Sequence, residues 1–306
     1  MPQTLPSGAQ YPLSLGAQHA VIVERGAGLR SYTSLGRAVV DGWAEDEPCP
    51  GCAGDVLAPW PGRVEESRYT FQGTEYHLVP TPGQGGTALH GLVNTRPWRL
   101  LAREPAAATL GVELAGEPGY PFPLALTMRW ALTPDGLVAT HGARNTGNTP
   151  CPVALGAHPY LGGGTGRVDD LVLQLPARTV QRMDAKLIPR ETLAVDALGF
   201  DFRSPTRIGA RVIDHTFGSL VTDAAGRGTL TVADPGGVTT ELWWEAPFRY
   251  IHLYTSDTLG PARCRRSLSV EPHTAPHNAL RSGQDLLLLA PGEAVEARWG
   301  LRVLAG

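Results

Sequence analysis

The stretch LALTMRWALTPDGLVATHGAR, residues 124–144, decides the fold, because it has the pattern of a β-hairpin with one buried face. The residues that fall on one side of its first half are Leu124, Leu126, Met128, Trp130 and Leu132. Polar residues point the other way, and a period of two is typical of a half-buried strand. The turn at 133–136 combines a proline that presets φ with a glycine that tolerates positive φ. We therefore expect residues 137–144 to return as the second strand.

Similar patterns occur further along the chain. A second hairpin is expected from 230–234 and 238–244 around a Pro-Gly-Gly turn, and a last strand at 297–303. The 37 glycines and 27 prolines are spread throughout and interrupt every stretch of 12 or more residues that could carry a helical stripe. No repeat of 20–50 residues is visible. The sequence predicts an all-β protein with residues 1–306 in a single domain.

Composition limits the classes of partner. The formal net charge is -3, and the basic residues are scattered rather than clustered. This argues against nucleic acid and against an anionic membrane surface, and it favours a small neutral ligand. Residues 1–18 lack the basic and apolar regions of a signal peptide, and no apolar run approaches the roughly 20 residues of a membrane span. We expect a cytoplasmic protein.

Cys49 and Cys52 have the CxxC spacing of redox and metal motifs. No second CxxC completes a zinc site, and no helix-forming sequence follows as in thioredoxin-like proteins. A plain loop with free thiols is the prediction, and a redox role is the alternative.

Four short motifs carry most of the functional information: Pro59-Trp60-Pro61-Gly62-Arg63, Leu89-His90-Gly91, Ala157-His158-Pro159-Tyr160 and Val270-Glu271-Pro272. In their order and spacing they resemble the aldose 1-epimerase, or galactose mutarotase, family. The resemblance extends over most of the chain, from 26–30 to 291–293.

That resemblance implies a large antiparallel β-sandwich of the galactose-mutarotase-like type, with a sugar cleft on a concave face. It also implies interconversion of the α and β anomers of an aldose without a cofactor. A base removes the proton of the anomeric hydroxyl while an acid protonates the ring oxygen, and reclosure after bond rotation gives the other anomer.

The resemblance makes Glu271 the base and His158 the acid. A base of this kind is expected to be buried, with a pKa tuned near the working pH. Histidine suits the acid because its ordinary pKa lies near neutrality. The alternatives are structural: Glu271 could satisfy nearby backbone donors or pair with Arg265 or Arg266, and His158 could be a hydrogen-bonded core histidine.

His90 matches the second active-site histidine of the family, and Arg63 matches an arginine that contacts sugar hydroxyls through its fork of donors. Asp214 resembles an aspartate that accepts hydrogen bonds from the sugar. Arg63 could instead pack on Trp60, and Asp214 could be a turn or cap residue.

Two positions depart from the family pattern. His252 stands where many relatives have glutamine, which puts substrate preference in doubt, although histidine can still bind a sugar hydroxyl. Gly62 stands where asparagine is frequent, which removes a side-chain contact. Tyr254 could stack on a pyranose face, and so could Trp243 or Trp244.

His273 and His277 have the H-x3-H spacing of two metal ligands on a helix. Pro272 and Pro276 make that helix improbable, and the resemblance requires no metal there. We therefore expect no metal site.

Other functions remain open at this stage. A glycoside hydrolase needs two carboxylates roughly 5–9.5 Å apart, and Glu271 and Asp214 are the acids that the motifs support. A non-catalytic sugar-binding protein would have no reason to keep a base and an acid together. A sugar-phosphate epimerase would need a phosphate cradle or a cluster of basic residues, and neither stands out.

Overall fold

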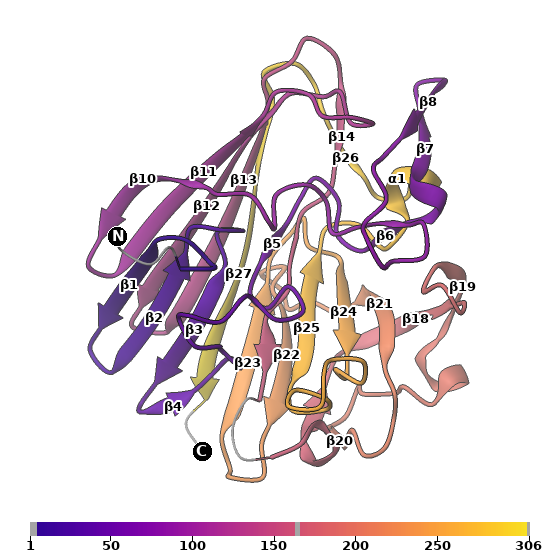
Figure 1. The fold of residues 1–306 in the computed structure, drawn as a ribbon. Helices are drawn as coiled ribbons and strands as arrows, with labels where there is room; N and C mark the ends of the chain where they lie inside the picture. Colours follow the sequence, from indigo (N-terminus) through magenta and orange to yellow (C-terminus); the bar gives the residue numbers. More distant parts are fainter. Residues whose placement is uncertain (1–4, 163–165, 305–306) are drawn as a thin grey trace.

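The computed structural model describes residues 5–162 and 166–304. Two large antiparallel sheets dominate it (Figure 1). The first has nine strands, in the spatial order β10 (Arg99–Glu104), β11 (Ala107–Leu114), β12 (Leu124–Thr133), β13 (Gly136–Asn145), β27 (Ala294–Leu304), β23 (Thr239–Trp244), β22 (Gly228–Ala233), β17 (Val172–Gln174) and β20 (Thr206–Arg207).

The second sheet has eight strands. Its order is β19 (Pro189–Ala194), β18 (Ala177–Met183), β21 (Asp214–Leu220), β24 (Tyr250–Tyr254), β25 (Leu268–His273), β15 (Gly156–Ala157) and β5 (Val56–Leu57), with β16 (Tyr160–Leu161) also paired to β25. Strand β25 is therefore central, held by β24 on one side and by β15 and β16 on the other.

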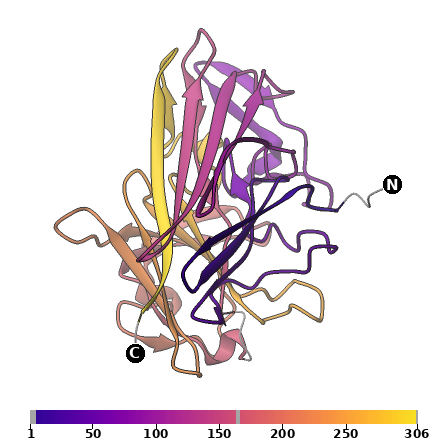
Figure 2. The same cartoon turned by 90° about the vertical axis from the view of Figure 1, so that its left-hand side faces the viewer.

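Smaller units complete the fold. A four-stranded sheet contains β1 (Gln10–Leu15), β2 (Gln18–Val23), β3 (Leu29–Ser34) and β4 (Arg37–Ala38), and it packs against β11 and β12 (Figure 2). The two-stranded units are β14 (Cys151–Val153) with β26 (Leu287–Leu289), β6 (Arg63–Val64) with β9 (Ala88–Leu89), and β7 (Arg68–Phe71) with β8 (Thr74–His77).

Helices contribute little to the described residues. The α-helix α1 (Ala279–Ser282) and the 3-10 turns η1 (Glu65–Ser67), η2 (Val168–Asp170) and η3 (Val195–Leu198) are all of four residues or fewer. Within residues 5–162 and 166–304, no helix has the length and apolar character needed to cross a membrane. The all-β prediction is confirmed, and its cause is the dense glycine and proline content.

The hairpin that opened the sequence analysis forms as expected. Strands β12 and β13 pair from Leu124↔Asn145 to Thr133↔Gly136, and Pro134 and Asp135 make the turn. The alternating residues Leu124, Leu126, Met128 and Trp130 are buried, whereas Thr127 and Arg129 are exposed. The second hairpin (β22 and β23) and the last strand (β27) are also present, within a few residues of their predicted ends.

The core fills the space between these layers. Trp130 of β12 meets Trp299 of β27 edge to face, with ring centroids 5.6 Å apart. The Trp130 indole N–H also donates to the Ala27 carbonyl oxygen at 2.9 Å, which ties the N-terminal sheet to the nine-stranded sheet. Buried aromatic pairs of this kind add to the free energy gained from the apolar area that they remove from water.

Candidate active site

One cavity of about 260 Å³ gathers the predicted residues. Its lining includes all seven that the sequence analysis named: Arg63, His90, His158, Asp214, His252, Tyr254 and Glu271. The other residues that line it are Gly51, Cys52, Gln84, Leu89, Tyr160, Leu187, Thr258, Leu259 and His277. The cavity lies over β21, β24 and β25, where the connections around β6, β9 and β15 approach the sheet.

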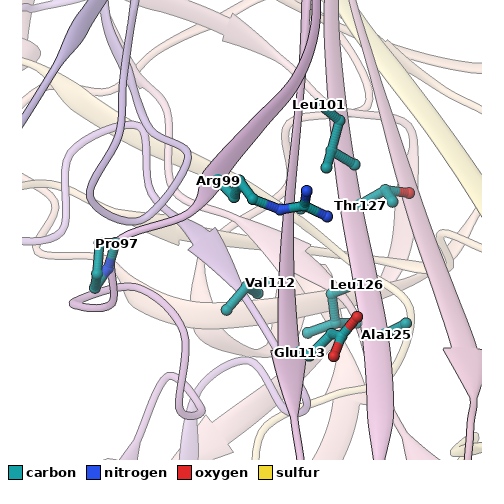
Figure 3. A pocket seen from close by; sticks show the side chains of 9 residues that line it. Pro97, Arg99, Leu101, Val112, Glu113, Ala125, Leu126 and Thr127 are labelled. Atoms are coloured by element: carbon teal, nitrogen blue, oxygen red, sulfur yellow. The ribbon is translucent and has the colours of Figure 1, made fainter.

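A larger hollow of about 480 Å³ lies elsewhere, on the face of β10, β11 and β12 (Figure 3). Its charged side chains are Arg99 and Glu113, beside apolar groups such as Leu101. It lacks the combination of buried carboxylate and imidazole that proton transfer requires, so its size does not make it the candidate site.

Glu271 is the best-held side chain of the smaller cavity. It is 1% exposed on β25, and strand alternation places Ser269 and His273 on its own face. One carboxylate oxygen, Oε1, accepts from Ser269 Oγ at 3.0 Å, and Oε2 accepts from His273 Nε2 at 3.1 Å. His158 Nε2 lies 3.3 Å from Oε1. The carboxylate is thus fixed on both oxygens.

The charge of Glu271 follows from its neighbours. Burial by itself raises the pKa of this carboxyl, but His158, His252 and His273 together hold it well below its usual range. The expectation of a pKa tuned near the working pH is wrong. Glu271 is instead ionised, and so in its basic form, over a wide pH range.

The structural alternatives for Glu271 are also wrong, because within the described residues its partners are Ser269, His273 and His158 rather than backbone N–H groups or arginines. Arg265 pairs with Asp257 at 2.6 Å and with Asp169 at 3.1 Å, and Arg266 pairs with Asp41 at 2.5 Å. Both arginines are therefore engaged by other carboxylates.

His158 lies between β15 and β16 and is clamped through its backbone. Its N–H donates to the Asp55 carbonyl oxygen, and its own carbonyl oxygen accepts from Gly54 N–H. Its ring stacks on Tyr160 with centroids 5.0 Å apart. Burial lowers the pKa of His158, and the charge of Glu271 opposes that shift.

His90 is a neutral donor. Its backbone takes a positive φ of 60°, and the Gly62 N–H donates to its Nδ1 at 3.2 Å. Because Nδ1 accepts, the ring proton of the neutral imidazole is on Nε2. Burial holds the pKa of His90 well below its ordinary value, although Glu271 opposes this. The ring meets His158 edge to face at 5.2 Å.

His90, His158 and Glu271 each offer one ligand atom, and these atoms lie within 4.8 Å of one another. A histidine that binds a metal through one nitrogen normally donates the proton of the other to an acceptor. His90 does the opposite, since its Nδ1 accepts from a backbone N–H. The three residues are therefore arranged for proton transfer and hydrogen bonding rather than for a cation.

Asp214 and His252 form a pair across β21 and β24. His252 Nε2 lies 3.0 Å from Asp214 Oδ1, and Nδ1 lies 3.0 Å from Thr216 Oγ1. Burial alone would lower the pKa of His252, but Glu271 and Asp214 raise it above its ordinary value. Both ring nitrogens are occupied by the protein, so His252 holds Asp214 in place rather than offering a free donor to the cavity.

Arg63 reaches the cavity from β6. Its Nη1 donates to Gln84 Oε1 at 2.7 Å and to Thr87 Oγ1 at 3.3 Å. Burial lowers its pKa, and Asp214 opposes that shift. Trp60, against which Arg63 could have packed, is 2% exposed and lies against Tyr120 in the core.

The predicted aromatic residues divide between the two sheets. Tyr254 lines the cavity and pairs through its hydroxyl with Thr258 Oγ1 at 2.8 Å. Trp243 and Trp244 lie on β23 of the other sheet and do not line it. Stacking on a sugar is open to Tyr254 and not to these tryptophans.

His277 is the residue that the sequence analysis undervalued. Its ring lies 4.2 Å from that of His252, and neither of its nitrogens has a hydrogen-bond partner within the described part of the chain. A Cβ on Gly62 would lie 2.1 Å from His277 Cδ2. The imidazole of His277 thus occupies the room left by the missing side chain at position 62.

The CxxC loop borders the same cavity. Gly51 and Cys52 line it, and Tyr160 donates to the Gly51 carbonyl oxygen at 3.0 Å. Burial raises the pKa of Cys52 to about 12 and that of Cys49 further, with Asp55 adding to both shifts. Because the thiolate is the reactive form, these shifts disfavour the nucleophilic form of both cysteines at neutral pH.

Comparison with known proteins shows to which protein family the chain belongs. A family model described as Aldose 1-epimerase matches residues 11–302. The chain belongs to the aldose 1-epimerase family. Among relatives of this family, the uncharacterized protein YihR of Escherichia coli K12 is 33% identical over 294 residues, which cover 94% of this chain and 91% of YihR. The galactose mutarotase of Rattus norvegicus is 28% identical over 65% of this chain, which spans 60% of the rat protein.

Solved structures of the family share the fold. An aldose epimerase homologue from C. elegans superposes with a TM-score of 0.86 at 20% identity, covering 97% of this chain and 98% of its own. A putative aldose 1-epimerase from Escherichia coli K12 gives a TM-score of 0.84 at 21% identity, with 97% and 99% covered. The expected galactose-mutarotase-like architecture is confirmed.

Proposed function

We propose that this protein is an aldose 1-epimerase that interconverts the anomers of a free monosaccharide. The observation that carries the proposal is the pair formed by Glu271 and His158. A fully buried carboxylate lies 3.3 Å from an imidazole, and both open on one cavity. The cavity volume of about 260 Å³ suits one sugar ring, since drug-sized ligands occupy roughly 300–1,000 Å³.

The reaction begins with Glu271 taking the proton of the anomeric hydroxyl. The electrons of that O–H bond form the aldehyde C=O, the bond from the anomeric carbon to the ring oxygen breaks, and the His158 imidazolium gives its Nε2 proton to the ring oxygen. Rotation about the bond between the first two carbons turns the other aldehyde face to the ring hydroxyl. Reclosure returns both protons to the groups that supplied them, so no cofactor is consumed.

The remaining cavity residues support orientation. The His90 Nε2–H donates to a sugar oxygen near the reacting centre, and Arg63 and Asp214 bind hydroxyls further along the ring. Tyr254 provides an aromatic face. His252 acts through Asp214.

The competing functions have less support. Hydrolysis of a glycoside needs a second carboxylate free to act, and Asp214 is bonded to His252. A sugar phosphate needs several cations, whereas Arg63 is the one arginine among the described residues that line the cavity, and it is bonded to Gln84. A non-catalytic sugar-binding protein would have no use for an imidazole held 3.3 Å from Glu271.

The test is anomer exchange, followed by polarimetry or NMR exchange spectroscopy on glucose, galactose, xylose and acidic hexose derivatives. We expect faster exchange for at least one sugar with the wild type, and a loss of about 100-fold or more in His158→Ala, because a positioned general acid contributes about 100- to 10,000-fold. The proposal is overturned if the wild type exchanges the anomers of every one of these sugars no faster than His158→Ala does. Release of a reducing sugar from a glycoside would favour the hydrolase.

A further inference from the structure

Ser269 is a buried hydroxyl that the functional motifs do not include. It lies on β25, two residues before Glu271, and is 0% exposed. Its backbone is paired with Tyr160 on one side and with Tyr254 on the other, so its position is fixed from both edges. Its Oγ lies 3.0 Å from Glu271 Oε1 and 3.0 Å from His158 Nδ1. It therefore joins the base and the acid of the proposed reaction.

The direction of these two hydrogen bonds follows from valence. A serine hydroxyl has one proton, and an ionised carboxylate can only accept. The Ser269 proton is therefore donated to Glu271, and His158 Nδ1 must be the donor to Ser269. In the neutral ring this leaves Nε2 unprotonated, and in the imidazolium the second proton is on Nε2, the nitrogen 3.3 Å from Glu271 Oε1.

We propose that Ser269 is a positioning residue that fixes His158 in the Nδ1–H form, so that the transferable proton is always on Nε2. This inference rests on the proposed function and deepens it. Ser269 does not line the cavity and acts on the sugar only through Glu271 and His158. A histidine held in the wrong tautomer loses most of its catalytic value, because the proton is then on the nitrogen that faces away from the reaction.

Ser267 provides a matched control close to Ser269 in the chain. It is 1% exposed, and its hydroxyl donates to the buried carboxylate of Asp41 at 2.9 Å. Ser267→Ala thus removes the same kind of hydrogen bond outside the cavity. Ser269→Thr keeps the hydroxyl and serves as the conservative variant, with thermal unfolding to establish that each variant is folded.

In Ser269→Ala we expect kcat to fall about 10- to 100-fold, by analogy with the loss of a hydrogen-bond partner that orients a metal-binding histidine, while KM changes little. The acidic limb of the kcat/KM profile moves to higher pH, because a hydrogen bond to a carboxylate favours its charged form and its loss raises the pKa. The other titratable groups that face this carboxylate, His90, His158, Tyr160, His252, His273 and His277, are all retained in the variant, and of these only His158 loses a hydrogen bond to Ser269. Ser267→Ala keeps kcat, and Ser269→Thr recovers most of the loss. An unmoved limb together with a wild-type kcat in Ser269→Ala overturns the inference.

A second measurement separates this inference from the proposed function. The ¹⁵N NMR shifts of the neutral His158 ring, recorded at pH 8, report which nitrogen carries the proton. We expect Nδ1–H in the wild type and in Ser267→Ala, and a mixture of tautomers in Ser269→Ala. Nε2–H in the wild type overturns the inference even if the protein is an active mutarotase. Nδ1–H without activity on any sugar sustains the positioning role and overturns the proposed function.

Discussion

His141 in the nine-stranded sheet and His252 in the eight-stranded sheet are both buried histidines, and their pKa values are shifted in opposite directions. His141, on β13, is 1% exposed; its Nε2 accepts from the Trp299 indole N–H at 2.9 Å, and burial lowers its pKa to about 3. His252 is 3% exposed, yet its pKa is raised because Glu271 and Asp214 outweigh burial. Burial lowers the pKa of a histidine, and at His252 the two carboxylates outweigh burial, whereas at His158 the charge of Glu271 does not.

The comparison shows that the carboxylates of Glu271 and Asp214 set the direction of the pKa shift of His252 in the cavity. The two histidines also make opposite contributions to stability as pH changes. A raised pKa in the folded state stabilises the protein below about pH 6.5, and that stabilisation is lost as pH rises through the folded value. A lowered pKa destabilises the folded state as pH falls below about 6.5.

The largest expected effect on kcat comes from removing the charge of Glu271, which His252 has beside it and His141 does not. Glu271→Gln keeps the shape of the side chain but cannot take a proton, so we expect kcat for anomer exchange to fall about 1,000-fold or more, within the range for a lost general base. The pKa of His252 falls in the same variant. Exchange spectroscopy and the histidine ring signals in NMR measure the two effects.

The control for that variant is Glu241→Gln, which removes a buried carboxylate on β23 of the other sheet. Its kcat should stay within about twofold of wild type, because a site remote from the cavity contributes independently. Equal losses in both variants would show that any buried negative charge is needed for folding, and Glu271 would not be the base.

Much of this comparison could be predicted from the sequence. The period of two in 124–132 and the turn after it predicted the hairpin, and the four motifs predicted Arg63, His90 and His158 beside Glu271. Further segments of the resemblance supplied Asp214, His252 and Tyr254, whereas Gln84, Thr258, Ser269 and His277 were not predicted. The motifs succeeded because each holds its residue in a local backbone shape, such as the positive φ of His90 beside Gly91.

The rest depends on contacts between distant segments. Nothing local shows that Gly62 leaves room for the His277 ring, since the two residues meet only when β6 and the segment after β25 come together. The hydrogen bond between His252 and Asp214 likewise forms only because β21 and β24 pair. A local signal did exist for Ser269, because a residue two positions before Glu271 on a strand shares its face.

Asp214→Asn removes the charge of the second carboxylate beside His252, and it should have the next largest effect on catalysis. Asparagine retains an oxygen for His252 but no negative charge, so the pKa of His252 falls while Glu271 still supports it. We expect kcat/KM to fall about tenfold, equivalent to about 1.4 kcal/mol of lost transition-state stabilisation, mainly through a higher KM. An unchanged His252 titration in NMR would show that Asp214 does not set its charge.

Gly62→Asn tests whether His277, which has no hydrogen-bond partner in the described residues, fills the space beside Gly62. Asparagine tolerates the φ of 67° at this position, but its Cβ would collide with the His277 ring. Overpacking of this kind costs about 1–3 kcal/mol, measured by denaturant unfolding. Combining it with His277→Ala should recover most of that loss. A double variant that is no more stable than Gly62→Asn would contradict the shared-space explanation.

His141→Gln has the smallest expected effect on turnover, which should be unchanged, because His141 lies outside the cavity. Glutamine can still accept the Trp299 N–H, but it cannot be protonated.

Between about pH 6.5 and the folded value of about 3, the unfolded wild type binds one more proton at this histidine than the folded protein does. Each pH unit in that window therefore costs the wild type about 1.4 kcal/mol of unfolding free energy at this residue. The variant avoids that loss, so its stability falls less steeply from pH 6 to pH 4 in urea titrations. Equal slopes in the two proteins would mean that His141 already carries a proton when folded, and that burial without a carboxylate does not suffice to neutralise a histidine here.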